Sequence, residues 1–452
     1  MTGRPHATLH RGMGLLQATA TNIITMVGIG PFLTIPLMLA AMNGPHIVYA
    51  WIAGAVLALA DGLVYAHLGA ALPGAGGPYL YVMEGYKPFG LGRLLAFVCL
   101  FQIVLVAPLT VASGGVGFAD YLRFYWTTMN DGERNVVAAL VCLATTALLY
   151  RDIKSTGRLT VVMLAVVMLT VAWVIVAGLF RFSPSMAFDF PPAAYRFDGA
   201  LISSLGATAI LAMYSYGGYT QVCFVAEEVT DPARTVPRAI VLSIVVVATL
   251  YILMSLVIVG MIPWEEAKKS RTIASLFIER TFDDPGSGRL AASVMTMLIL
   301  FVAATSLFGN ILGYSRILFA AAREGDFFEP FARVHPTKGF PHVSVVVIGA
   351  IAVPFCFFTL GQVISWLIQV QILLQFMWQS GAALSLVHLR RDINQPFRMW
   401  AYPLPALLSA ALWLYIFVTG PRDGIVFAVS VFAIAVPSYF IFRRRRVANV
   451  TI

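Results

Sequence analysis

The sequence predicts an all-α protein that crosses a membrane many times, and two observations support this class. Of the 452 residues, 59% are hydrophobic and only 11% are charged, and the mean hydropathy is +0.84. The apolar residues also form long runs between charged loops, and a bilayer needs about 20 mostly apolar residues per helix. Since no run alternates between polar and apolar residues, membrane-spanning strands are excluded.

We mark twelve apolar segments along the chain. The first is long and lacks a small-residue cleavage site, so we expect it to remain as the first membrane helix. The cysteines fall inside segments without a short CxxC pair, so they are predicted to be small buried apolar residues. The segments are 17–42, 47–71, 92–118, 136–150, 159–180, 201–226, 239–262, 290–322, 342–360, 363–389, 403–419 and 424–442.

The loop charges predict the orientation in the membrane. If the N-terminus is cytoplasmic and the segments alternate, most of the 30 basic residues fall in inner loops or in the C-terminal tail, including the run Arg443 to Arg446. This positive-inside pattern predicts that both termini are cytoplasmic. We expect the protein in the inner membrane of the cell. The net charge of +9 therefore indicates contact with anionic lipid headgroups, not with nucleic acid. The sequence predicts no particular oligomeric state.

The first and sixth segments are interrupted at their centres. The run "MVGIGP", Met26 to Pro31, places two glycines and a proline in the first, and "YSYGGYTQ", Tyr214 to Gln221, places a glycine pair in the sixth. Glycine costs a helix interior about 1 kcal/mol and proline about 3 kcal/mol relative to alanine. Close helix packing is the alternative explanation, but Gly28 and Gly30 do not fit small-x-x-x-small spacing. We therefore predict two discontinuous helices.

Discontinuous helices at matching positions of two halves indicate a transporter built from inverted repeats. Under this interpretation one repeat of five helices covers 17–180, a second covers 181–389, and two further helices cover 390–442. Residues 1–16 and 443–452 are predicted to be cytoplasmic ends.

The two breaks are predicted to form a binding site, because irregular backbone survives at membrane depth only where it is buried or lines a cavity. The helix start after Gly28 offers free amides and a positive dipole end, which suit a carboxylate. The carbonyls of the second break and those before Gly28 suit an ammonium group. A zwitterion would satisfy both. The predicted substrate-binding residues are Met26, Val27, Gly28, Ile29, Gly30, Tyr214, Ser215, Tyr216, Gly217 and Gly218.

Four stretches resemble one family in order along nearly the whole chain. They are "MVGIGPFLTIP", "LGAALPGAGGPYLYVMEGY", "YSYGGYTQVCFVAEEVTDPARTVPRAI" and "SRILFAAAREG". Together they resemble the amino acid, polyamine and organocation transporter superfamily, and "YGGY" is most similar to the L-type amino acid transporters and their bacterial relatives. The resemblance implies a LeuT-like fold with twelve helices and a secondary transporter for amino acids.

The resemblance also implies roles for individual residues. It places an aromatic gate at Tyr214 and a side-chain contact at Asn310, and with Ile103 these indicate a substrate with a medium or large apolar side chain. Thr220 occupies the position of a glutamate in arginine exporters. The chain departs from the family at Val167, nearest to a lysine of proton-coupled members, and at His67, where a glutamate is usual.

The coupling ion is predicted to be Na⁺ or H⁺, and no cofactor is expected. Thr305 and Ser306 resemble a hydroxyl pair that forms a sodium site with carbonyls near Ile24 and Val27, since hard cations prefer oxygen ligands. The alternative is that these hydroxyls bond the preceding helical turn. For proton coupling, Asp61 and His67 are the candidates, because an intramembrane carboxylate is costly and histidine titrates near neutral pH. Both can equally be structural.

The sequence thus predicts a permease that moves a neutral, apolar amino acid across the membrane by alternating access. A cationic substrate would need a carboxylate partner in the low-dielectric site, and neither break supplies one. The alternatives are a polyamine or organic-cation carrier, for which Asp61 or Glu84 would have to reach the site, and a non-transporting amino acid sensor. No catalytic triad, phosphate-binding loop or HExxH motif occurs, which argues against an enzyme.

Overall fold

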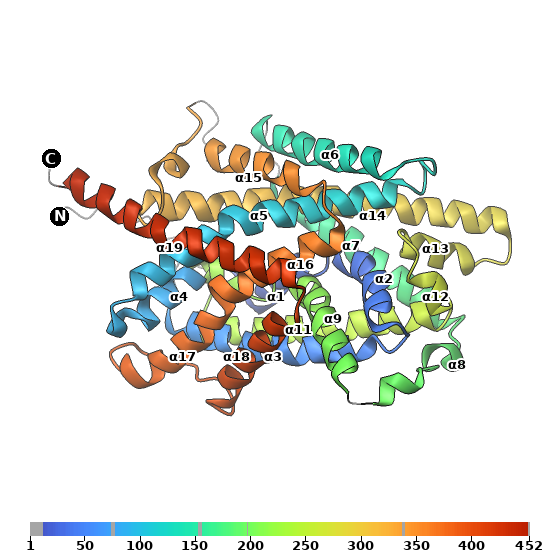
Figure 1. The fold of residues 1–452 in the computed structure, drawn as a ribbon, viewed down its shortest axis with the longest axis horizontal. Coiled ribbons are helices and arrows are strands. Elements are labelled where there is room, and N and C mark those ends of the chain that lie inside the picture. The colour runs from blue at the N-terminus through green and yellow to red at the C-terminus, as the bar shows by residue number, and fades with distance from the viewer. Residues whose placement is uncertain (1–11, 74–76, 152–155, 197, 337–339, 451–452) are drawn as a thin grey trace.

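The computed structural model describes residues 12–73, 77–151, 156–196, 198–336 and 340–450, and these are almost entirely helical (Figure 1). Within these ranges the one extended pairing is an isolated bridge between Met13 and Val229. The helices are α1 (Leu15–Met26), α2 (Gly30–Met42), α3 (Val48–Ala71), α4 (Pro78–Gly85), α5 (Gly92–Leu122), α6 (Asp131–Arg151), α7 (Thr156–Leu179), α8 (Pro184–Ala187), α9 (Gly199–Tyr216), α10 (Gln221–Phe224), α11 (Pro232–Val259), α12 (Trp264–Ala267), α13 (Ile273–Arg280), α14 (Pro285–Arg323), α15 (His342–Phe355), α16 (Leu360–Gln371), α17 (Met377–Leu389), α18 (Leu404–Thr419) and α19 (Arg422–Val450). The 3₁₀ turns are η1 (Lys87–Phe89), η2 (Pro192–Tyr195), η3 (Ala226–Glu228) and η4 (Glu329–Ala332), and η5 (Ile372–Phe376) is a π-helical turn that joins α16 to α17.

Eight helices of the described residues are long and apolar enough to cross a membrane, or nine when the bent pair α1 and α2 counts as one span. Three further apolar helices are shorter, at Leu164–Leu179, His342–Phe355 and Leu404–Thr419. Each of the twelve predicted segments contains helix. The chain is therefore an integral membrane protein.

Local sequence explains where several helices begin and end. α2 begins with Gly30 and Pro31, and proline suits the first turn because its missing N–H would have no partner there. The Asp198 carboxylate caps α9 by accepting the amides of Ala200 and Leu201 at 3.1 and 3.0 Å. At α16, Thr359 and Gln362 form a reciprocal capping box.

The packing partners repeat between the two halves of the chain. α3 packs on α11 and α5 packs on α14. The pair α1 and α11 has a counterpart in α9 and α3, and the pair α5 and α15 has one in α14 and α6. Each half also carries an eight-residue helix before its longest helix, α4 before α5 and α13 before α14. In Figure 1 these two short helices lie at opposite ends of the bundle.

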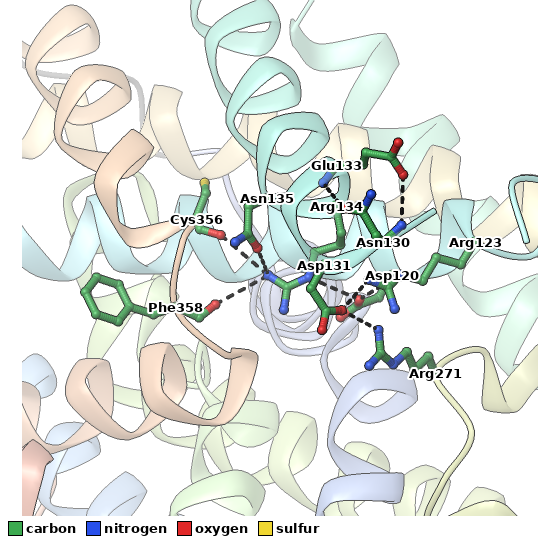
Figure 2. A network of polar contacts seen from close by, with 10 residues as sticks. All are labelled: Asp120, Arg123, Asn130, Asp131, Glu133, Arg134, Asn135, Arg271, Cys356 and Phe358. Atoms are coloured by element: carbon green, nitrogen blue, oxygen red, sulfur yellow. Dashed lines mark hydrogen bonds and ion pairs between the residues drawn. The ribbon is translucent and has the colours of Figure 1, made fainter. Parts of the chain in front are cut away.

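The α13 end of the bundle carries a network of charges (Figure 2). Asp131 accepts from Arg123 at 2.6 Å and from Arg271 at 3.1 Å, while Arg134 faces Asp120 at 3.5 Å. The Arg134 side chain is only 10% exposed and the Arg271 side chain is 51% exposed. The Arg134 pair therefore holds α6 against α5 from inside the bundle, whereas the Arg271 pair is exposed to solvent and contributes little to stability.

All four cysteines are buried and free, as the sequence predicts. Cys142 on α6 and Cys356 at the end of α15 bring their Sγ atoms to 3.7 Å. Cys99 donates to the carbonyl of Leu374 in the π-helical turn. These thiols pack between helices like other small apolar side chains.

Candidate functional site

The first break separates α1 from α2 by three residues and bends the chain by 49°. The amide of Val27 still donates to the Ile23 carbonyl at 2.7 Å, and that of Gly28 turns back to the Met26 carbonyl at 3.1 Å. The amides of Ile29 and Gly30 have no acceptor within the described residues. The first turn of α2 therefore presents unpaired donors and the positive end of its dipole.

The second break separates α9 from α10 at residues 217–220. Gly218 has φ +117°, a conformation open to glycine and costly for other residues. The Gly217 amide donates to the Tyr214 carbonyl at 3.3 Å. The carbonyls of Tyr216 and Gly217 accept no hydrogen bond within the described residues, so this break presents unpaired acceptors.

The two breaks are in contact. A Cβ at Gly30 would lie 3.5 Å from Cε1 of Tyr214 and 3.6 Å from Cα of Ser215, and a Cβ at Gly218 would lie 2.9 Å from the carbonyl carbon of Thr25. The hydroxyls of Thr34 on α2 and Ser215 on α9 are hydrogen bonded at 2.9 Å. Gly30, whose amide is unpaired, thus lies against the last turn of α9, which directly precedes the unpaired carbonyls of Tyr216 and Gly217.

Tyr251 on α11 joins the two breaks directly. Its hydroxyl lies 2.7 Å from the Met26 carbonyl and 3.1 Å from the Ser215 carbonyl, and it donates to both. The Tyr251 side chain is fully buried. One phenol therefore spans the end of α1 and the end of α9.

The remaining pocket candidates are spread along three helices. The Tyr214 hydroxyl is paired with Ser113 of α5 at 2.9 Å, and the Tyr216 hydroxyl donates to the Trp51 carbonyl at 3.1 Å. Ile103 is buried on α5, about 15 Å of helix rise from Ser113. Tyr214 of α9 therefore lies beside the second break, whereas Ile103 lies away from Ser113 along α5. Asn310 lies on α14, one turn beyond Ser306.

The two hydroxyls of the candidate sodium site, Thr305 and Ser306, make different contacts. The Thr305 hydroxyl donates to the Phe301 and Val302 carbonyls at 2.8 and 3.0 Å, which is the bond to the preceding turn that the alternative explanation describes. Ser306 differs, because its Oγ would lie 3.4 Å from a Cβ at Gly28. Ile24 is in the last turn of α1 and Val27 follows its end. Ser306 therefore faces the first break, whereas the Thr305 hydroxyl bonds its own helix.

Asp61 is fully buried on α3 and accepts three hydrogen bonds. Tyr219 of the second break donates to Oδ2 at 2.6 Å, while Ser409 and Trp413 of α18 donate to Oδ1 at 2.8 and 2.9 Å. The carboxylate therefore connects the second break to α18, and these three partners are all neutral. His67 lies two turns further along α3, is also buried, and accepts the Met399 amide at Nδ1.

Glu84 is paired away from the breaks. Its carboxylate accepts from Arg390 at 2.6 Å and lies 3.5 Å from Lys87. The pKa of Arg390 is raised because its guanidinium donates hydrogen bonds to the carboxylates of Asp392 and Glu84, so the guanidinium stays charged. Glu84 thus fastens α4 to the end of α17.

Comparison with known proteins identifies the family. A family model for amino acid permeases matches residues 13–442, which is most of the chain. The chain belongs to the amino acid permease family. This confirms the resemblance to the amino acid, polyamine and organocation superfamily.

The permease is similar to several characterised transporters. It is 26% identical to the human cystine/glutamate transporter, over 97% of this chain and 87% of the relative. It is 24% identical to the methylthioribose transporter and 23% identical to the branched-chain amino acid permease BcaP, both of Bacillus subtilis (strain 168). Each of these two matches covers 97% of this chain and 94% of the relative. The relatives are transporters, which supports a non-enzymatic role.

Sequence reasoning missed several residues of the permease's site. Tyr251 is the clearest, and Ser113 and Thr34 are the others. One signal was present, because a hydroxyl inside a long apolar helix needs an internal hydrogen-bond partner when it is buried. The signal does not identify the partner, because the partner is distant in the chain: Tyr251 and Met26 are 225 residues apart.

Proposed function

We propose that this permease is a secondary transporter that moves a neutral amino acid by alternating access, with its substrate held between the two breaks. The observation that carries the proposal is the contact of Gly30 with Tyr214 and Ser215, which brings the free amides of the first break to the end of α9, where the carbonyls of Tyr216 and Gly217 are unpaired. The amides suit the α-carboxylate and the carbonyls suit the α-ammonium. Thr25 and Gly217 are exposed although they lie in the middle of apolar segments, which supports access to the site.

A neutral substrate is favoured on electrostatic grounds. A second positive charge in a low-dielectric site needs a carboxylate partner, and the two carboxylates that a polyamine carrier would use are engaged elsewhere. Asp61 is bonded to Tyr219, Ser409 and Trp413, and Glu84 to Arg390. The likeness to a branched-chain amino acid permease supports an apolar side chain, with Tyr214 and Asn310 as the proposed pocket residues.

We further propose the twelve-helix, five-plus-five inverted arrangement for this chain. The nine long spans together with the three shorter apolar helices would make twelve. The repeated packing pairs, α3 with α11 and α5 with α14, support two related halves, as do α4 and α13 at opposite ends. The basic loops support cytoplasmic termini in the inner membrane.

For the coupling ion, two proposals stand. Sodium would use the carbonyls of Ile24 and Val27 with the hydroxyls of Thr305 and Ser306, and the position of Ser306 near Gly28 supports this site. Protons would use Asp61, whose bond to Tyr219 connects it with the second break, or His67.

The test is uptake by purified permease in proteoliposomes. We expect uptake of labelled leucine and none of putrescine, and counterflow of leucine separates a transporter from a sensor. Gly30→Val should abolish leucine binding because its γ-methyl groups fill the space next to the free amides. Gly30→Ala is the matched control, since its Cβ meets Tyr214 at an ordinary 3.5 Å and should retain binding. Wild-type uptake by Gly30→Val would refute the site, and putrescine uptake would refute the substrate class.

A further inference from the structure

The position of the Tyr251 hydroxyl is fixed by aromatic packing. The ring of Tyr251 packs against Trp51 with centroids 5.1 Å apart and against Tyr216 with centroids 5.6 Å apart. The Trp51 and Tyr216 rings pack on each other as well, at 5.8 Å. All three side chains are fully buried. The ring of Tyr251 is therefore held between Trp51 of α3 and the last residue of α9.

The two carbonyls that accept hydrogen bonds from Tyr251 both lie at the C-terminal end of a helix. Met26 is the last residue of α1, and Ser215 lies in the last turn of α9. The last four carbonyls of a helix have no donor within that helix, so each needs a partner from elsewhere. Because one O–H serves one carbonyl from each broken helix, it fixes the separation between the two helix ends.

The same contact changes which carbonyls remain for a substrate. The Met26 carbonyl already accepts both Tyr251 and the Gly28 amide, and the Ser215 carbonyl accepts Tyr251. The Tyr214 carbonyl accepts the Gly217 amide. Of the acceptors that the sequence assigns to the ammonium group in the second break, those of Tyr216 and Gly217 stay unpaired.

We propose that Tyr251 is a positioning residue that sets the distance between the carboxylate seat and the ammonium seat, and that it directs the substrate ammonium to the carbonyls of Tyr216 and Gly217. This inference rests on the proposed function. A phenylalanine would fill the same aromatic space, and a buried hydroxyl is costly unless it is hydrogen bonded, so the O–H itself makes the difference. A ligand that uses both seats depends on this distance. A ligand that uses one seat does not.

The experiment compares two ligands on purified full-length Tyr251→Phe. Leucine has both charged groups, and 4-methylpentanoate is the same molecule without the amine. We expect leucine binding to weaken about ten-fold, which corresponds to roughly 1.4 kcal/mol, while binding of 4-methylpentanoate changes little. Hydrogen exchange should accelerate in peptides covering 26–30 and 214–218 and stay unchanged in the other helices.

Tyr125→Phe is the matched control. The Tyr125 hydroxyl also contacts two oxygens, the Ser293 carbonyl at 2.6 Å and its Oγ at 3.0 Å, away from the breaks. This variant should bind leucine like the wild type. Unchanged leucine binding by Tyr251→Phe would overturn the inference, and so would equal weakening of both ligands with faster exchange throughout the bundle. If the wild type binds no leucine, the proposed function fails, and exchange at the two breaks still decides the role of Tyr251.

Discussion

The contact between the two breaks can be tested by placing a single methyl group at Gly218. In Gly218→Ala the new Cβ would lie 2.8 Å from Cγ2 of Thr25 and 2.9 Å from its carbonyl carbon. Carbon atoms do not approach this closely, and the Thr25 backbone is fixed at the end of α1. The substitution must therefore push the two breaks apart or strain both.

The magnitude follows from two costs. A non-glycine residue at φ +117° costs about 1–3 kcal/mol of backbone strain. Overpacking a filled contact by one methyl group costs a further 1–3 kcal/mol or so. Gly218→Ala should thus lose roughly 2–6 kcal/mol of stability, or release part of this strain by moving the carbonyls of Tyr216 and Gly217 away from the first break.

The assay combines thermal unfolding in detergent with leucine uptake in proteoliposomes. We expect a lowered unfolding temperature and loss of uptake. Gly361→Ala is the control, because a Cβ there meets nothing within 4 Å and alanine favours the helix α16. Wild-type unfolding temperature and uptake in Gly218→Ala would refute the contact between the breaks.

Two further predictions concern the coupling ion. If sodium binds beside the first break, leucine uptake should depend on a sodium gradient, and replacing both Thr305 and Ser306 with alanine should remove this dependence; sodium-independent uptake by the wild type would contradict the ion site. Asp61→Asn replaces one acceptor oxygen by a donor that faces Tyr219 or Trp413, so we expect a loss of about 2 kcal/mol in the free energy of unfolding. If Asp61 also carries the coupled proton, uptake by this variant should no longer respond to an imposed pH gradient, and a retained response would exclude that role.

The helices and both breaks were predictable from sequence because their signals are local. Each apolar segment carries its own length and composition, and the clusters of glycine with proline or with a second glycine at the two breaks are costly inside a helix. The first break is found at 27–29, inside "MVGIGP", and the second at 217–220, inside "YSYGGYTQ". The short helices α4 and α13 were not predicted, since eight residues are too few to show a clear helical period.

The hydrogen-bond partners were not predictable, because they join residues that are distant in the chain. Tyr251 is one tyrosine in a 28-residue apolar helix, and nothing beside it in sequence points to Met26 or Ser215. The difference between neighbouring Thr305 and Ser306 is also invisible in sequence. One hydroxyl bonds its own helix and the other faces Gly28 because successive residues on a helix point about 100° apart.

The burial of every cysteine has a practical consequence for spectroscopy. Because Cys99, Cys142, Cys223 and Cys356 are all shielded, the native chain offers little background to a thiol-reactive dye. A cysteine introduced at Thr25, which is exposed beside the second break, would be the preferred attachment point. Fluorescence from a label there would report movement of the two breaks in real time, without prior removal of any native thiol.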